Sequence, residues 1–404
     1  MDSPFRPLYE APSIMSPAIR YILNFISWIY SSVALVYRRW VALGGKQFRV
    51  GGRVFVSESI LGEGATGIVH RVREMGGSGG LFAVKEMLRV PRADVEREVA
   101  AHERCRHCEF VLPLLAWELQ NVNAQQQEAP QRRILSRDGA PYSLTSSGGP
   151  GGEEGECEVN AQLLFPLALG SLDAMIQEAV RKKEGFAVGD AGEVGLGGGG
   201  GLTEGEALRF TLHLARGLHA LHMGGWAHRD VNPRNALLFP STAAAAYGLG
   251  EEGLPVAVLA DLGSVAPRAA PRNNRLQALS IMEEAEARSS QPYRAPELWQ
   301  CDADPENPLL GEPGDVWALG CTLFSCLHGV SPFECLPGRG GRLVLTQPCL
   351  TRTLGAIAWP AKGGETESVR RIISRCLSKE PAQRPTLVEL MEEIARVLAT
   401  ASGR

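Results

Sequence analysis

The sequence predicts an α+β fold, with strands early in the chain and helical segments after them. Short apolar runs near glycine-rich stretches, such as residues 53–56 and 81–84, predict strands early in the chain. A polar start at residues 203–204 predicts a helix in the second half. An uncharged apolar stretch within residues 19–40 predicts a further helix that precedes these elements.

A glycine-rich run, GEGATGIV at residues 62–69, matches the pattern G-x-G-x-x-G-x-V. Gly62, Gly64 and Gly67 would let the backbone approach phosphate oxygens closely and point N–H groups at them. The pattern alone is unspecific, because an ordinary glycine-rich hairpin turn explains it about as well. Its meaning therefore depends on which motifs follow it.

The next motif is an apolar run, LFAVK at residues 81–85, that ends in a lysine. A buried ammonium group at Lys85 needs an acidic partner. A segment with a helical pattern follows, and it contains two glutamates. Glu98 is the candidate partner, and Glu96 is the alternative, since helix register cannot be fixed from sequence to better than a few residues.

Acidic and amide side chains recur in two motifs of the second half. The run HRDVNPRN at residues 228–235 contains Asp230 and Asn235, and the apolar run VAVLADLG at residues 256–263 delivers Asp261. Carboxylate and amide oxygens are suitable ligands for Mg²⁺. Three more short motifs follow in order: APE at 295–297, DVWALG at 315–320 and QRP at 383–385.

This set of motifs, in this order, resembles that of the protein kinases. The resemblance implies a two-lobed protein kinase fold, with a small lobe built on a β-sheet with one helix and a larger lobe that is mostly helical. It also implies ATP and Mg²⁺ as cofactors, and transfer of a phosphoryl group to a protein. It assigns catalysis to Asp230, Lys85, Asn235 and Arg234, and metal binding to Asn235 and Asp261. It assigns ATP binding to Leu61, Gly62, Gly64, Gly67, Val69, Ala83, Lys85, Glu98, Pro166, Ala168 and Leu237. It also pairs Arg384 with Glu297 in the large lobe and makes the 315–320 helix a support for the catalytic loop.

One residue of the catalytic loop departs from the kinase pattern. The basic residue expected two positions after Asp230 is replaced by Asn232. Loss of a cation at the transferred phosphate would cost about 2–4 kcal/mol of transition-state stabilisation, which describes a slow enzyme rather than an inactive one. Tyrosine kinases are similar in placing an arginine where this chain has Arg234, so Arg234 is a candidate for the missing cation. The alternative is that Arg234 is a solvated surface charge.

Further motifs resemble one kinase family, the Numb-associated kinases. They are WAHRD at 226–230, DLGS at 261–264, SSQPYRAPEL at 289–298 and the hinge LLFPL at 163–167, with a segment at 274–288 similar to this family's extra activation-segment helix. The hydroxyl of Ser290, five residues before the APE motif, favours serine or threonine as acceptor, with dual specificity as an open alternative. The alternative hypothesis for the function is a catalytically impaired, nucleotide-binding scaffold at a membrane.

Composition limits the other classes of function. The 404 residues carry a formal net charge of −4, which gives no basic footprint for nucleic acid. The nine cysteines are scattered and odd in number, which suits a reducing cytosolic setting. Cysteines and histidines cluster at residues 102–108, but no second ligand pair follows at zinc spacing. We therefore expect a helix end there rather than a metal site.

The kinase resemblance and the length together imply the domain organisation. One catalytic unit with additions fits 404 residues. We expect an N-terminal segment at 1–47, a small lobe at 48–168 with an insertion at 121–158, and a large lobe at 169–400 with insertions at 185–201 and 241–253. The insertions are rich in glycine, alanine or glutamine, so we expect them to form flexible surface loops.

The N-terminal segment predicts membrane association. Residues 21–37 carry no charge and are mostly apolar, and Arg38 and Arg39 follow them, which favours a kinase domain on the cytosolic side. A spanning helix, a helix lying in the interface and a helix docked on the small lobe all remain open. The family resemblance implies a place in membrane traffic, on the cytoplasmic face of the Golgi or other endomembranes. The chain lacks the glycine after Met1 that myristoylation needs.

Overall fold

The structure, a computed structural model, describes most of the chain from residue 45 onward. These residues form two compact units, each with its own hydrophobic core. Unit 1 extends to Val90 and then from Leu115 to Leu167, and unit 2 comprises residues 91–114 together with those from Ala168 onward. The described ranges are 45–64, 66–77, 79–122, 132–133, 158–184, 195–196, 201–241, 254–306, 308–337, 343–360 and 364–402.

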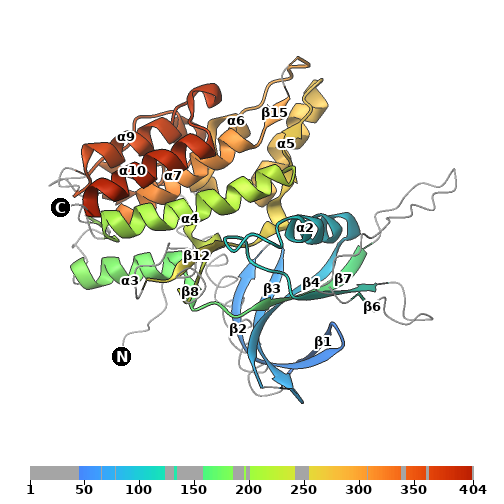
Figure 1. The fold of residues 1–404 in the computed structure, drawn as a ribbon. Coiled ribbons are helices and arrows are strands. Elements are labelled where there is room, and N and C mark those ends of the chain that lie inside the picture. Colours follow the sequence, from blue (N-terminus) through green and yellow to red (C-terminus); the bar gives the residue numbers. More distant parts are fainter. Residues whose placement is uncertain are drawn as a thin grey trace, which may run out of the picture. The chain divides into compact units, whose positions relative to one another are not determined.

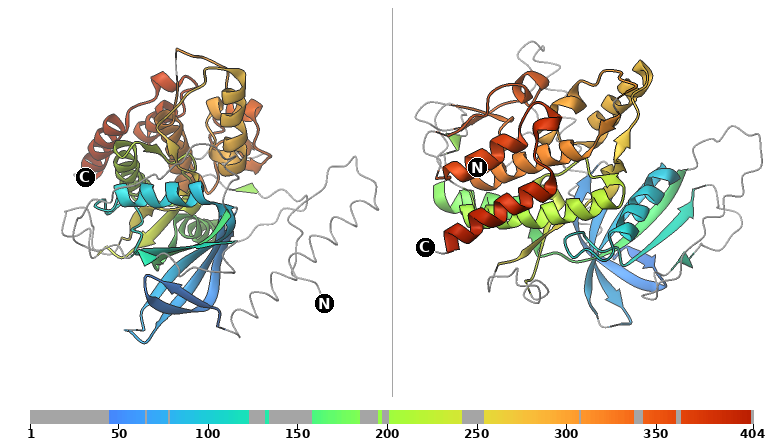
Figure 2. Two further views of the ribbon diagram at one scale, coloured as in Figure 1. Left: turned by 90° about the vertical axis from the view of Figure 1, so that its right-hand side faces the viewer. Right: turned by 45° about the horizontal axis from the view of Figure 1, so that its top comes forward.

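Unit 1 is built on a seven-stranded sheet with the strand order β1-β2-β3-β4-β7-β5-β6 (Figure 1). Figure 2 shows β1 to β4, in blue, as neighbours in one twisted sheet. Alternating apolar side chains on these strands form its core, which contains Phe48, Val50, Phe55, Val72, Val84, Ala116 and Leu164. The strands are β1 (Gln47–Val50), β2 (Arg53–Gly64), β3 (Gly67–Met75), β4 (Leu81–Pro91), β5 (Ala116–Asn121), β6 (Arg132–Arg133) and β7 (Glu158–Pro166).

The glycine-rich run forms the tip of the β2–β3 hairpin, where Gly64 lies opposite Gly67. Gly67 has a φ of 145°, and a Cβ atom there would lie 2.3 Å from the carbonyl oxygen of Glu86 on β4. Both facts exclude any other residue at this position without a shift of the backbone. The close approach of the hairpin to β4 therefore depends on glycine.

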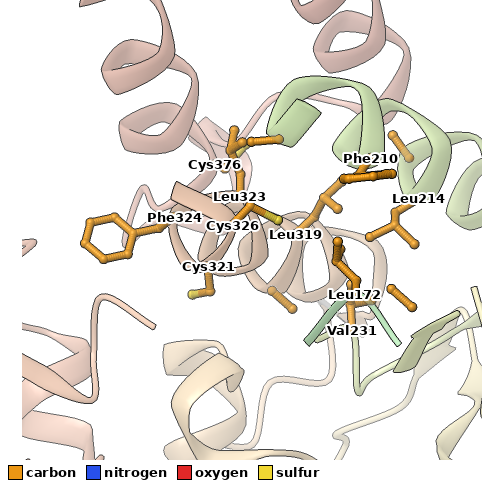
Figure 3. Packing of buried hydrophobic residues seen from close by; sticks show 14 of the residues in the cluster. Leu172, Phe210, Leu214, Val231, Leu319, Cys321, Leu323, Phe324, Cys326 and Cys376 are labelled. Carbon is orange, nitrogen blue, oxygen red and sulfur yellow. The ribbon is translucent and has the colours of Figure 1, made fainter. Parts of the chain in front are cut away.

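Unit 2 is mostly helical, and α7 lies at its centre. Apolar residues cover nearly all faces of α7, so the helix is buried along most of its length. Figure 3 shows its side chains Leu319, Leu323 and Phe324 among residues from other elements. The helices are α2 (Arg92–Arg104), α3 (Leu172–Glu184), α4 (Glu204–Met223), α5 (Arg275–Arg288), α6 (Pro296–Trp299), α7 (Glu312–His328), α8 (Leu350–Thr353), α9 (Glu367–Cys376) and α10 (Leu387–Ser402).

The ends of these helices follow from local sequence. Thr203 and Glu206 form a capping box at the start of α4, with the Thr203 side chain accepting from the Glu206 backbone N–H. The helix α7 has Pro313 in its first turn, and it ends at His328 because the next residue, Gly329, has a φ of 82°. These residues explain where α4 begins and where α7 begins and ends.

Short strands hold the loops of unit 2 that carry the chemical motifs. The catalytic run begins after β10 (Trp226–Ala227), passes through a 3₁₀ turn, η1 (Pro233–Asn235), and leads into β11 (Ala236–Phe239). β11 pairs with β12 (Val256–Leu259), so the two acidic motifs lie on adjacent strands. The remaining short elements are β8 (Gly170–Ser171), β9 (Gly195–Leu196), η3 (Leu262–Ser264), β13 (Ala266–Pro267), β14 (Ala269–Ala270), η4 (Gln291–Tyr293), β15 (Leu309–Leu310), β16 (Cys335–Pro337), β17 (Leu343–Leu345) and η6 (Pro381–Gln383).

The helix α2 groups with unit 2, although its sequence position lies within the expected small lobe at 48–168. The loop after α2 explains this. Val111 forms a parallel bridge with Leu259, and the N–H of Leu112 donates to the Leu259 carbonyl oxygen at 2.8 Å. Backbone pairing with β12 therefore ties residues 91–114 to unit 2.

Two of the expected insertions contribute short strands. β6 pairs with β5, with Trp117 opposite Arg133, and β9 pairs with β17, with Gly195 opposite Val344. The rest of residues 121–158, 185–201 and 241–253, like the N-terminal segment 19–40, lies largely or wholly outside the described residues. Among the helices that the structure describes, none has the length and apolar character to cross a bilayer.

Candidate active site

The catalytic loop holds the carboxylate of Asp230 by two hydrogen bonds. Oδ1 accepts from the backbone N–H of Ser290, and Oδ2 accepts from Nδ2 of Asn235, each at 2.8 Å. Burial raises the pKa of Asp230, hydrogen bonds from Ser290 oppose this, and the nearby Asp261 carboxylate adds to the rise. The carboxylate is thus fixed in direction and has an enhanced affinity for a proton.

Asn235 presents its amide oxygen for a cation. Its Nδ2 donates to both the backbone oxygen and the Oδ2 of Asp230, at 2.8 Å each. Because both bonds use the amide nitrogen, Oδ1 is the atom that a metal ion would use. The Asn235 side chain thus orients the candidate base, Asp230, and leaves its own oxygen available as a candidate metal ligand.

Asp261 supplies the second candidate metal ligand. It caps η3 with a left-handed backbone, φ 57° and ψ 72°, and its Oδ1 accepts from the N–H of Gly263 at 3.4 Å. The oxygen donors of Asn235 and Asp261 fit Mg²⁺, which prefers carboxylate and carbonyl oxygen and retains several waters. The two residues therefore suit a metal bound together with a phosphate ligand.

The cysteine and histidine cluster at residues 102–108 begins in the last turn of α2 and continues past its end. Nδ1 of His102 lies 2.9 Å from the backbone oxygen of Leu112, and burial raises the pKa of Cys105 to about 11. Across the described ranges, no group of three or more His, Cys, Asp or Glu side chains is arranged to hold a metal ion. The expectation of a helix end is confirmed, since α2 ends at Arg104.

Buried hydrogen bonds from α7 hold the catalytic loop from below. The Asp315 carboxylate accepts from the backbone N–H groups of His228 and Arg229, and lies 2.8 Å from Nε2 of His222. His228 Nε2 lies 3.0 Å from the Ala260 carbonyl oxygen, which identifies Nε2 as its protonated nitrogen. This arrangement fixes the loop between α7 and the end of β12, as the sequence predicts for the 315–320 helix.

The helix α5 is tied to the catalytic loop by Glu284. Its Oε2 accepts from Nη1 of Arg229 at 2.7 Å, and its Oε1 lies 3.4 Å from Nη1 of Arg97 on α2. Arg229 is almost wholly buried, so its charge needs an anionic partner. Sequence reasoning missed Glu284, because the two partners lie 55 and 187 positions away from it.

A second ion pair fastens α5 to α2. Asp94 accepts from Arg97 and from Arg288, each at 2.5 Å. Arg288 also donates to the Gly263 carbonyl oxygen at 3.2 Å, and the Ser264 hydroxyl donates to the Arg288 carbonyl oxygen at 2.7 Å. These contacts connect the segment after Asp261 to both helices.

We expect Glu284→Ala to lower the free energy of unfolding by about 1–2 kcal/mol. The value is below that for a fully buried pair, because a third of the Glu284 side chain is exposed. Urea unfolding measures the change, and Glu283→Ala, at an exposed position of the same helix, is the control. Equal unfolding free energies for the two variants would show that Glu284 does not stabilise the catalytic loop.

Arg234 is exposed, and its backbone N–H donates to Oδ1 of Asn232 at 3.0 Å. The positive charge of Arg234 lies near the carboxylate of Glu334. Burial raises the pKa of Glu334, and the nearby guanidinium of Arg234 partly offsets that rise. A role of Arg234 at a transferred phosphate stays a prediction.

The nucleotide-binding candidates of unit 1 lie on β2, β3, β4 and β7. Lys85 is buried on β4 directly opposite Val69, and Ala83 is buried two residues before it. Leu61 is more than half exposed on β2, and Pro166 ends β7. A buried cation beside a glycine hairpin suits the phosphates of a nucleotide.

Other candidates lie in unit 2. Glu98 is 1% exposed on α2, whereas Glu96 is exposed and pairs with Arg92 at 2.7 Å. Burial therefore favours Glu98 over Glu96 as a partner for a buried cation, and its pairing with Lys85 stays a prediction. Leu237 lies on β11 opposite Val258, and Ala168 opens unit 2 after the hinge. The assignment of all these residues to ATP binding also stays a prediction.

The predicted pair between Arg384 and Glu297 is confirmed. Nη1 and Nη2 of Arg384 bind the two carboxylate oxygens of Glu297 at 2.6 and 2.8 Å. The guanidinium also donates to the Pro313 carbonyl oxygen and lies over the ring of Trp317. This bidentate pair connects the segment after η4 to the start of α7.

Comparisons with known proteins agree with these motifs. Residues 174–394, more than half of the chain, match the family model described as protein kinase domain. Serine/threonine-protein kinase 16 of Mus musculus is 31% identical over 203 residues, 50% of this chain and 59% of the relative. The Homo sapiens protein of that name is 30% identical, also over 50% of this chain and 59% of the relative. Serine/threonine-protein kinase ENV7 of Saccharomyces cerevisiae is 31% identical over 41% of this chain and 40% of its own length. The chain thus spans under two thirds of each relative.

Proposed function

Because the chain belongs to the protein kinase family, we propose that it transfers the γ-phosphate of ATP to serine and threonine hydroxyls of proteins. The observation that carries this proposal is the Asp230 carboxylate, which both Asn235 and Ser290 hold in place. A carboxylate with fixed direction can orient an acceptor hydroxyl and take its proton as the new bond forms.

The chain's residues divide the remaining tasks. ATP bound with Mg²⁺ supplies the phosphoryl group and the metal charge that stabilises it in transfer. Asn235 and Asp261 would hold the metal, and Lys85 the phosphates. Ser290 lies beside the base, and its hydroxyl favours a serine or threonine acceptor over the longer tyrosine.

Activity of the purified full chain with Mg²⁺ and ATP tests the proposal. We expect phosphate transfer to a serine and threonine peptide well above that of an Asp230→Ala control. Turnover equal to that control would favour the second candidate, a nucleotide-binding scaffold, to which the neutral Asn232 in the catalytic loop points. A peptide with tyrosine as its only acceptor that outperforms the serine peptide would overturn the acceptor class.

We further propose that residues 19–40 attach the protein to a membrane, with the kinase domain in the cytosol. The support is the uncharged stretch at 21–37 and the adjacent Arg38 and Arg39. A fusion of residues 1–48 to a fluorescent protein should localise to membranes, and a variant with Leu23 and Phe25 changed to serine should do so less. A diffuse signal from the unchanged fusion would contradict the proposal.

A further inference from the structure

Asn232 is buried in the catalytic loop with hydrogen bonds on both atoms of its amide group. Oδ1 accepts from the backbone N–H groups of Arg234 and Asn235, at 3.0 and 3.3 Å. Nδ2 donates to the backbone oxygen of Asp230 at 3.0 Å and to Oγ of Ser290 at 3.3 Å. The full donor and acceptor capacity of the amide is used.

The neighbours of Asn232 fix the orientation of its amide. A flipped amide would direct its NH₂ group at two N–H donors and its oxygen at the Asp230 carbonyl oxygen, which are both repulsive arrangements. Only a neutral side chain with both an acceptor and a donor satisfies all four partners. A lysine at this position has no acceptor for the two N–H groups that begin η1.

The bonds of Asn232 lead to Asp230 by two routes. One is direct, through the backbone oxygen of Asp230, which also accepts from Asn235 Nδ2 at 2.8 Å. The other passes through Ser290, whose side chain hydrogen-bonds the Asp230 carboxylate and whose N–H donates to Oδ1. Since Asn232 donates to the Ser290 oxygen, the hydroxyl proton of Ser290 is directed away from Asn232 and toward the carboxylate.

We propose that Asn232 is a positioning residue that holds Ser290 against Asp230, so that the carboxylate keeps its direction by neutral hydrogen bonds instead of a cation. The proposal rests on the proposed kinase activity, because it concerns the base of that reaction. It separates two tasks within one side chain. Oδ1 stabilises the turn of η1, and Nδ2 sets the geometry of the base.

Asn232→Asp separates the two tasks. An aspartate keeps an acceptor for the two N–H groups of η1 and is a good cap, so the melting temperature should stay near that of the wild type. It cannot donate to Ser290, so we expect kcat to fall about tenfold, the effect of one lost hydrogen bond, with KM for ATP unchanged. Wild-type kcat for Asn232→Asp would overturn the proposal, because a purely structural cap predicts that result.

Variants of Ser290 provide the control for the added charge. Ser290→Ala should lower kcat by a similar factor, Ser290→Thr should retain it, and the double variant Asn232→Asp with Ser290→Ala should fall no further than either single change. If Asn232→Asp lowers kcat equally with and without Ser290, charge repulsion at Asp230 is the cause and the proposal fails. If Ser290→Thr loses as much as Ser290→Ala, packing rather than the hydroxyl is responsible, with the same conclusion.

Failure of the proposed function would be seen separately, as wild-type turnover no higher than that of Asp230→Ala. The link between Asn232 and Ser290 is then measured by the unfolding free energies of the same four proteins. Non-additive changes support the link, and strictly additive changes overturn it. If Asn232→Asp does not fold, the comparison of Ser290→Ala with Ser290→Thr decides the role of the hydroxyl.

Discussion

Asp230→Asn is expected to lower kcat for phosphate transfer by roughly 10²- to 10⁴-fold, the usual contribution of a positioned acid or base. The amide keeps the size of the side chain, and its oxygen can accept from the Ser290 N–H as Oδ1 of Asp230 does. It cannot take a proton from the acceptor hydroxyl. Its NH₂ group would also face the Nδ2 group of Asn235, which now donates to Oδ2.

Whether Asp230→Asn lowers kcat or raises KM shows whether Asp230 serves the transfer step or substrate binding. The Asp230 side chain hydrogen-bonds Asn235 and Ser290, so we expect the change to act on the transfer step and to leave KM for ATP nearly unchanged. Steady-state rates with varied ATP measure both constants, and Asp302→Asn, at an exposed position, is the control. A kcat close to that of the control would show that Asp230 does not serve the reaction.

Motif spacing was sufficient to find the local parts of the site. Asp230 and Asn235 are five residues apart on one loop, and the backbone of that loop alone brings them together. The strand before Asp261 is a continuous apolar run, and it pairs with β11 as its composition suggests. Such short-range features need no knowledge of the tertiary fold.

The contacts of α5 could not be predicted in the same way. Glu284 meets Arg229 and Arg97, and Arg288 meets Asp94 194 positions earlier. Nothing in a helix of mixed charge shows which of its acidic residues faces a buried guanidinium. The same limit left Glu96 and Glu98 as alternatives, and burial favours Glu98 without showing its partner.

Asn232 is a residue whose unusual type is visible in the sequence but whose contacts are not. The sequence marks it as unusual, because a cation is expected at its position. The sequence does not show that the amide bonds four partners in the turn, three of which belong to its own loop. In the structure, the neutral amide that stands where a cation is expected has all of its hydrogen-bonding groups in use.

Asp315→Ala is expected to lower the free energy of unfolding by about 3–5 kcal/mol, the cost of removing one partner from a buried charged network. The substitution removes the acceptor of the His228 and Arg229 N–H groups and the partner of the His222 ring. Urea unfolding at neutral pH measures the change, with Asp302→Ala as the exposed control. A change no larger than that of the control would mean that α7 does not hold the loop.

The pH dependence of this difference has a defined sign. Burial alone would raise the pKa of Asp315, but the hydrogen bond and charge of His222, with the charge and N–H of His228, bring it below its ordinary value of 3.8. A depressed folded pKa means that the stabilisation is fully present above the pKa of the unfolded chain and is lost as the pH falls through the folded value. The gap between the wild type and Asp315→Ala should therefore be constant near neutral pH and shrink below about pH 4. A gap that widens as the pH falls would mean that the Asp315 carboxylate is protonated more readily in the folded protein than in the unfolded chain, contrary to its three hydrogen bonds.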